Sequence, residues 1–178
     1  MPADTSPAST PPQSTSRRDV VVTGLAGAVA MAVAMGLGRF YFTPILPAMM
    51  SGVPMGPAEA GYIASANYLG YLLGAVLAAY GWAEGIERRV ALSGLLATSL
   101  LLIAMSLTTD IVLFSAIRFF AGIASAFVMI FASSLVLSYG LARGRTAVQS
   151  FHFGGVGTGI SISAILFAAV MMWGGDWR

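Results

Sequence analysis

The sequence predicts an all-α membrane protein, a bundle of helices that cross the bilayer several times. Of its 178 residues, 57% are hydrophobic and only 9% are charged, whereas a typical soluble domain is about 25% charged. Five segments are apolar over the roughly 20 residues that a helix needs to cross the hydrocarbon core. The arginines gather in alternate connections between these segments, as expected for a multi-pass protein.

Residues 1–19 are rich in Pro, Ser, Thr and Ala and contain too few apolar side chains to pack, so we expect a disordered cytoplasmic tail. Its end, from Ser16 to Val20, resembles a twin-arginine export signal. The apolar segment that follows is too long for such a signal, and four more spans come after it. We therefore interpret Arg17 and Arg18 as charges that set topology. The rival is an exported protein with a cleaved signal.

Residues 20–178 contain the predicted spans, at about 20–50, 60–83, 90–109, 111–139 and 146–173. The first and fourth are interrupted only by Arg39 and Arg118. Membrane strands need only about 10 residues and an alternating pattern, which these segments lack. All five are predicted to be helices.

Arginine placement predicts the orientation. With a cytoplasmic N-terminus, the inside regions hold six arginines and the outside loops, at about 51–59 and 108–110, hold none. The six are Arg17, Arg18, Arg88, Arg89, Arg143 and Arg145. An excess of this kind marks the cytoplasmic side.

Arg39 and Arg118 are the first functional candidates. A charge at the bilayer centre costs roughly 2.5–3.5 kcal/mol on insertion scales, so it usually faces a protein interior or a wet cavity. At helical spacing each shares a face with small or weakly polar residues, such as Gly36 and Thr43 for Arg39 and Gly122 for Arg118. The structural alternatives are snorkelling and a hydrogen-bonding hub.

Four further residues are weaker candidates. His152 titrates near neutral pH and is able to relay protons; the alternative is an interfacial or helix-capping histidine. Asn67, Tyr68 and Tyr71 are candidates for lining a pathway, and their alternative is hydrogen bonding between helices. The three tryptophans are predicted to be interfacial anchors.

Several classes of function lack support. The chain has no cysteine and one histidine, which argues against disulfides, iron–sulfur clusters and a structural zinc site. The glycine-rich run at 154–159 follows no strand, so it is not a dinucleotide loop, and there is no P-loop. No paired carboxylates or nucleophile–base pair are visible, so we expect no enzyme, cofactor or metal. The formal charge of +2 is not spread as a nucleic-acid-binding face would be.

Four segments, in order, carry a family resemblance: GLGRFYFTPILP at 36–47, SANYLGYLLG at 65–74, RFFAGIASA at 118–126 and HFGGVG at 152–157. They resemble the first, second, fourth and fifth helices of the YbfB/YjiJ-like subgroup of the major facilitator superfamily. The resemblance implies a bacterial inner-membrane secondary transporter that works by alternating access. It also implies that the first and fourth helices line the cavity, and a role for Arg118 in proton coupling.

One motif of the superfamily fits poorly. The loop that follows the second helix keeps an acid at Glu84 and a basic pair at Arg88 and Arg89. Gly85 stands where a basic residue is usual and Glu87 where a glycine is usual. In such transporters this loop is thought to latch the two halves, so the departure puts that role in doubt here.

Members of the superfamily have about 12 spans in two six-helix halves. With five spans, the sequence looks like a truncated N-terminal half. The expected partners are the bilayer, a small-molecule substrate, and either a missing C-terminal half or a second copy; no nucleic acid is expected. Because the spans hold two cations and no central carboxylate, we hypothesise a small anionic or amphipathic cargo with an anionic group. The alternative is a non-transporting membrane protein, or a gene fragment without activity of its own.

Overall fold

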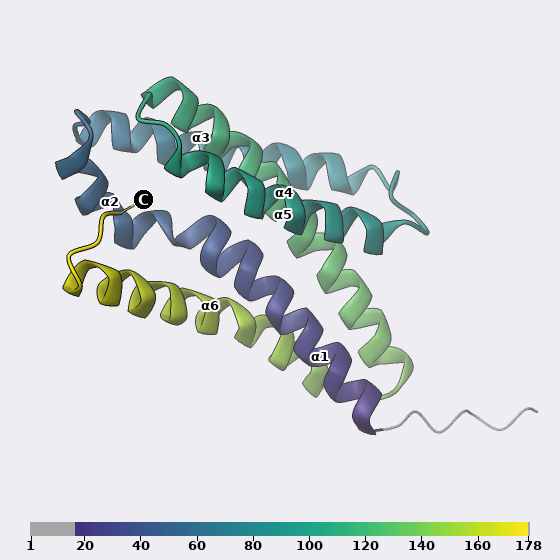
Figure 1. Ribbon diagram of the computed structural model, residues 1–178. Coiled ribbons are helices and arrows are strands. Elements are labelled where there is room, and N and C mark those ends of the chain that lie inside the picture. Colours follow the sequence, from purple (N-terminus) through teal and green to yellow (C-terminus); the bar gives the residue numbers. More distant parts are fainter. Residues whose placement is uncertain (1–16, 178) are drawn as a thin grey trace, which may run out of the picture.

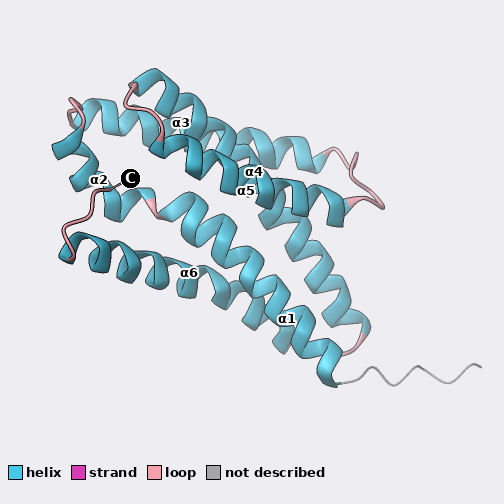
Figure 2. Ribbon diagram, viewed as in Figure 1, coloured by secondary structure: helices cyan, strands magenta, loops and turns pink. Residues whose placement is uncertain are grey.

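The computed structural model describes residues 17–177, and every regular element among them is helical (Figures 1 and 2). Five helical segments are long and apolar enough to cross a membrane, which confirms the predicted multi-pass bundle. The elements are α1 (Arg17–Met31), the π-helix η1 (Ala32–Phe40), α2 (Phe42–Gly52), α3 (Pro57–Ala79), α4 (Glu87–Ser106), α5 (Ile111–Ala142) and α6 (Ala147–Met172). The first three together form one span, Arg18–Gly52.

The helix boundaries follow local chemistry. The predicted tail lies outside the described residues except at its end, where α1 begins at Arg17 with Asp19 in its first turn. The α3 helix starts with Pro57, and the Glu59 carboxylate accepts a hydrogen bond from the Gly56 N–H at 2.9 Å. The Asp110 carboxylate caps α5 by accepting from the Leu113 N–H at 2.8 Å.

The helices pack in two groups around α5. The α3 and α4 helices pack against α5, whereas α1 and η1 pack mainly against α6. Glycines bring the backbones together: Gly70 and Gly74 of α3 meet α5, and Gly155 and Gly159 of α6 meet α1 and η1. Close approach through small residues is how membrane helices gain van der Waals contact where lipid offers no hydrophobic drive.

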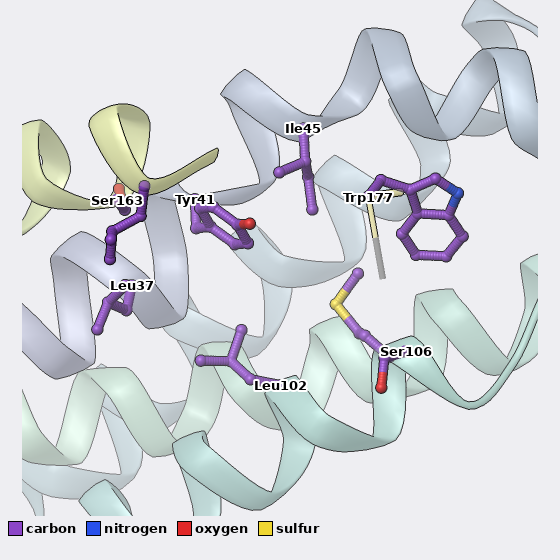
Figure 3. A pocket seen from close by; sticks show the side chains of 9 residues that line it. Leu37, Tyr41, Ile45, Leu102, Ser106, Ser163 and Trp177 are labelled. Atoms are coloured by element: carbon purple, nitrogen blue, oxygen red, sulfur yellow. The ribbon is translucent and has the colours of Figure 1, made fainter. Parts of the chain in front are cut away.

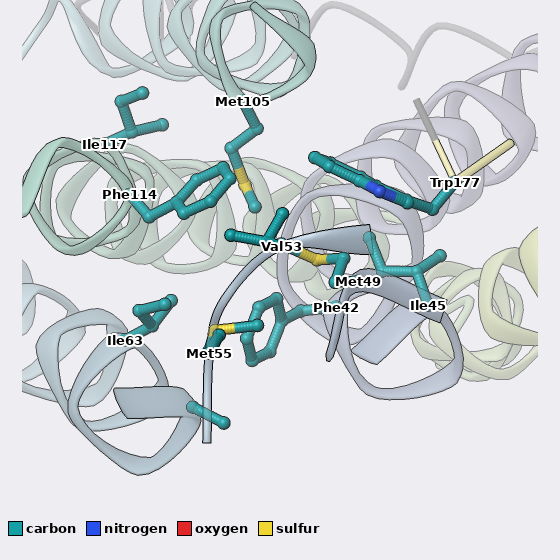
Figure 4. Close-up of a cluster of buried hydrophobic side chains, with 11 residues drawn as sticks. Phe42, Ile45, Met49, Val53, Met55, Ile63, Met105, Phe114, Ile117 and Trp177 are labelled. Carbon is teal, nitrogen blue, oxygen red and sulfur yellow. The ribbon is translucent and has the colours of Figure 1, made fainter. Parts of the chain in front are cut away.

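A hydrophobic cluster fills one end of the bundle and includes Trp177 (Figure 4). After α6 the chain turns at Gly174, whose φ of 76° suits glycine, and returns over the bundle. Trp177 is only 6% exposed, and its ring centroid lies 6.1 Å from that of Phe114. It is therefore a core residue, and the prediction of an interfacial anchor was wrong at this position, whereas Trp173 is 87% exposed.

The six arginines that predicted the orientation lie at one end of the bundle. The start of α1, the α3–α4 connection and the α5–α6 connection gather at that end (Figure 1). The α2–α3 and α4–α5 connections lie at the opposite end. The fold thus separates an arginine-rich end from an end whose connections contain no arginine.

Candidate functional site

The two intramembrane arginines line one small cavity of about 40 Å³. Its walls come from η1 and α2, from α3 and from α5, so three parts of the bundle build it. The lining residues are Arg39, Phe40, Phe42, Thr43, Ala64, Asn67, Tyr68 and Arg118. A cavity needs about 10–15 Å³ of water-accessible space to hold a water molecule, so this one has room for a small polar group.

The first span breaks beside this cavity. The π-helix η1 ends at Phe40 and α2 begins at Phe42, and the helical register changes at Tyr41, which keeps right-handed helical backbone angles and is drawn as a short loop (Figure 2). In π-helical register the donor to the Arg39 carbonyl is residue 44, but Pro44 has no N–H. The proline therefore leaves a main-chain acceptor without its helical donor at the break.

Arg118 supplies donors at this point. Its two terminal nitrogens donate to the carbonyl oxygens of Gly38 and Arg39, each at 3.0 Å. Its guanidinium carbon lies 4.8 Å from the centroid of the Phe42 ring, and the residue is only 3% exposed. The Arg118 side chain thus ties α5 to the break in the first span.

Arg39 is held differently, by aromatic rings of α3. Its guanidinium carbon lies 3.9 Å from the centroid of the Tyr71 ring and 5.1 Å from that of Tyr68. The Tyr71 hydroxyl donates to Met129 Sδ at 2.7 Å, which fixes the ring that carries the cation. Cation–π contacts of this kind contribute about 0.5–2 kcal/mol, more when desolvated.

Asn67 connects the same parts of the structure. It is 2% exposed, and its Nδ2 donates to the carbonyl oxygen of Arg118 at 2.8 Å. The structure therefore brings together Arg39, Arg118, Asn67, Tyr68 and Tyr71, five of the six candidates for substrate binding or coupling.

Two features of this site disfavour the positive charges of Arg39 and Arg118 unless an anion binds there. The Nε atoms of Arg39 and Arg118 are both buried and have no hydrogen-bond partner among the described residues. None of the residues that line the cavity is acidic. Two like charges thus share a partly desolvated space without a compensating carboxylate, an arrangement that a bound anion would relieve.

The sixth candidate, His152, lies elsewhere. It is fully buried where α1, α5 and α6 meet, with Nε2 3.0 Å from the Ser133 hydroxyl and Nδ1 against the backbone of Gly27. Ser133 follows Arg118 by about four turns of α5, which is roughly 22 Å. His152 is therefore buried between helices and is not part of the arginine cavity.

The α3–α4 loop has its own reason to depart from the superfamily motif. Gly85 has a φ of 78°, a left-handed conformation that disfavours the basic side chain usual there. Glu84, Arg88 and Arg89 are all exposed at the arginine-rich end. The loop is instead fixed by local contacts, including the Trp82 indole N–H, which donates to the Leu77 carbonyl at 2.8 Å.

Sequence reasoning missed two parts of the site. One is Phe42, whose ring covers the Arg118 guanidinium, and the other is the pair of main-chain carbonyls that Arg118 binds. The available signal was Pro44, a helix breaker five residues after an intramembrane arginine.

A second cavity lies nearby and has a different character (Figure 3). It measures about 300 Å³ and lies among η1, α2, α4, α6 and the returning Trp177. Its lining includes Leu102, Leu166 and the two hydroxyl groups of Ser106 and Ser163, and no charged side chain. The arginine cavity is therefore the smaller of the two, but it is the one in which charge is concentrated.

The comparisons with known proteins agree with the fold and the resemblance. The model of a family described as "Uncharacterised MFS-type transporter YbfB" matches residues 31–177. No curated protein and no solved structure shows significant similarity to the chain. The family match runs from the last residue of α1 to Trp177 and includes every residue of the arginine cavity. The protein is thus a multi-pass membrane protein that belongs to this MFS-type transporter family.

Proposed function

We propose that the protein is a secondary transporter of a small molecule that carries an anionic group. The observation that supports this most is the cavity with two arginines and no lining carboxylate. Family membership supports transport in general, and the cavity chemistry suggests the class of cargo. From the family resemblance we propose a bacterial inner membrane, and from the positive-inside rule an N-terminus in the cytoplasm.

The electrostatic argument has a direct functional consequence. A partly desolvated cation without a counter-charge is destabilising, and a second cation beside it adds to this cost. An anion that enters the cavity offsets this unfavourable state and forms charge-assisted hydrogen bonds with guanidinium groups. Empty and occupied states of the cavity then differ in energy, and such a difference lets a substrate shift a transporter between conformations.

The described helices provide one wall of a transport path. In the proposed mechanism a second helical bundle completes it, and the two bundles rock about the central site. That second bundle is either another part of the same protein or a second copy of the chain. The exposed Glu84 lies on the α3–α4 connection and the exposed Arg88 and Arg89 in the first turn of α4, and such rocking would bring them near the other bundle.

We also propose that transport is coupled to protons. The acidic side chains of the described residues all lie at or near span ends, so a central carboxylate is missing from this part of the chain. The candidates for coupling are therefore His152, which is buried and bonded to Ser133, and the Arg118 network. Because His152 lies roughly 22 Å along the helices from the arginines, its effect would pass through helix packing.

Uptake into membrane vesicles from bacteria that express the protein tests this function. Vesicles receive an imposed pH gradient and radiolabelled organic acids, inorganic anions or neutral amines. We expect gradient-driven uptake of an anionic compound, with at least a tenfold loss in Arg39→Gln. The matched control is Arg145→Gln, which removes an exposed arginine far from the cavity.

Normal uptake by Arg39→Gln contradicts its role in binding. Absence of uptake for every compound favours the alternative, a non-transporting membrane protein.

A further inference from the structure

We infer that the arginine cavity takes the head of a monocarboxylate, that Arg39 alone binds it, and that Arg118 is a positioning residue. This inference rests on the proposed function and deepens it, because it assigns unequal roles to two residues of the same type. It follows from what each guanidinium group already contacts.

The guanidinium group of Arg118 already makes hydrogen bonds to the protein, whereas that of Arg39 makes none among the described residues. An arginine side chain has five N–H donors in a planar fork, and both of its terminal nitrogens already donate to main-chain carbonyls at 3.0 Å. One face of the group is covered by Phe42. Those carbonyl dipoles also offset part of its charge, so the two terminal nitrogens of Arg118 are held on the main chain, although its buried Nε has no partner among the described residues.

Arg39 is satisfied on one face only. Tyr71 covers the plane of its guanidinium group at 3.9 Å. The described structure gives that group no hydrogen bond to the protein, and its buried Nε has no partner. Stacking on the ring holds the plane in place and leaves N–H edges for an incoming ligand. A planar fork of this kind matches the two oxygens of a carboxylate.

The cavity limits both the size and the charge of the head. A space of about 40 Å³ admits a carboxylate-sized group. We place the body of the ligand outside, next to the Tyr68 ring, which is 60% exposed. Since only the guanidinium group of Arg39 lacks hydrogen bonds to the described residues, we assign it one carboxylate. A monocarboxylate with an apolar body meets these conditions, whereas phosphate and sulfate lack the apolar body.

The two hydrogen bonds of Arg118 fall on the backbone that carries Arg39. One acceptor is the carbonyl of Arg39 itself, and the other belongs to the residue before it. The register change at Tyr41 and the missing N–H of Pro44 leave this stretch without full helical support. Loss of the Arg118 bonds therefore frees the backbone of Arg39, which weakens binding without removing the group that recognises charge.

Ligand binding by the purified protein tests the assignment, measured by isothermal calorimetry with four probes. Benzoate is the monocarboxylate, benzamide its neutral isostere, and phthalate and inorganic phosphate supply additional charge. We expect benzoate to bind at least tenfold more tightly than each of the others. In Arg39→Gln the ratio of the benzamide Kd to the benzoate Kd should fall to about one. In Arg118→Gln, affinity for benzoate should fall about tenfold while the preference remains. Arg145→Gln should match the unaltered protein.

The outcomes separate the inference from the transport function. If the preference is lost equally in Arg118→Gln, then Arg118 contacts the ligand and the division of roles is wrong. Tighter binding of phosphate or phthalate than of benzoate, or no binding of any probe, overturns the monocarboxylate assignment. Arg118→Lys, which keeps the charge, replaces Arg118→Gln if the latter does not fold. Gradient-driven uptake in vesicles is measured separately, so it tests the transporter proposal independently of ligand binding by the purified protein.

Discussion

At the scale of single residues, Asn67 shows how polar side chains are used within this bundle. Its amide is almost completely buried, and the Nδ2 hydrogen bond to the Arg118 carbonyl at 2.8 Å joins α3 to α5. Where the backbone of α5 is fixed, the side chain of Arg118 leaves it in a defined direction. The hydrogen bond therefore supports the cavity as well as the helix pair.

The stability that this bond contributes is expected to be modest. Hydrogen bonds between membrane helices average about 0.6 kcal/mol and reach about 1.7 kcal/mol. We expect Asn67→Ala to lower the free energy of unfolding by roughly 1 kcal/mol, measured by unfolding in mixed micelles. Ser65→Ala, at an exposed position on the same helix, is the control and should leave stability unchanged. Equal effects of the two substitutions would show that the bond contributes nothing measurable.

Sequence reasoning reached the members of the site but not their roles. Arg39, Tyr68 and Tyr71 were all candidates, and the rings do stack on the cation. The partners of Arg118 could not be predicted because they are main-chain carbonyls, which carry no residue-specific signal. Whether those carbonyls are available depends on a helix break, and whether Arg118 reaches them depends on packing between segments 80 residues apart.

At the scale of elements, the bundle depends on glycines that face neighbouring backbones. A Cβ at Gly155 would collide with the backbone of Ala28, whereas one at Gly154 would meet nothing within 4 Å. These adjacent residues of α6 therefore differ only in the direction that they face. Backbone atoms of Ala28 cannot move aside without separating α1 from α6.

This contrast predicts opposite effects of the same small substitution. Gly155→Ala should lower the free energy of unfolding by about 1–3 kcal/mol, the usual cost of overpacking a tight contact. Gly154→Ala should be neutral, or stabilising by up to about 1 kcal/mol, because alanine favours helix over glycine. Unfolding midpoints of the two variants, compared in one detergent, measure the difference. Similar midpoints would mean that α1 and α6 are not in close contact.

Helices were the most predictable elements, because length and hydropathy alone define a membrane span. The π-helical geometry of η1 was not predicted. It accompanies close approaches that sequence does not reveal: a Cβ at Gly36 would meet the backbone of Gly159, and one at Gly38 would meet the Thr98 side chain. The burial of Trp177 was missed for a similar reason, since it follows from a turn after α6 that returns the chain to the bundle.

At the scale of the whole molecule, charge is divided between the two ends of the bundle. Arginines occupy the end with the α3–α4 and α5–α6 connections, and the opposite connections contain none (Figure 1). Positive charge near membrane helices is retained on the cytoplasmic side during insertion. The proposed orientation thus depends on the sum of several charges, and no single arginine is expected to determine it.

Single-cysteine labelling tests this orientation directly, because the chain contains no cysteine of its own. Thr109→Cys lies in the α4–α5 connection and Ala142→Cys at the end of α5, and both native residues are exposed. In intact spheroplasts a membrane-impermeant maleimide should label Thr109→Cys, whereas Ala142→Cys should react only after permeabilisation. The reverse pattern would place the N-terminus outside. Equal labelling of both before permeabilisation would contradict a single orientation, because then the arginines at one end would not have directed insertion.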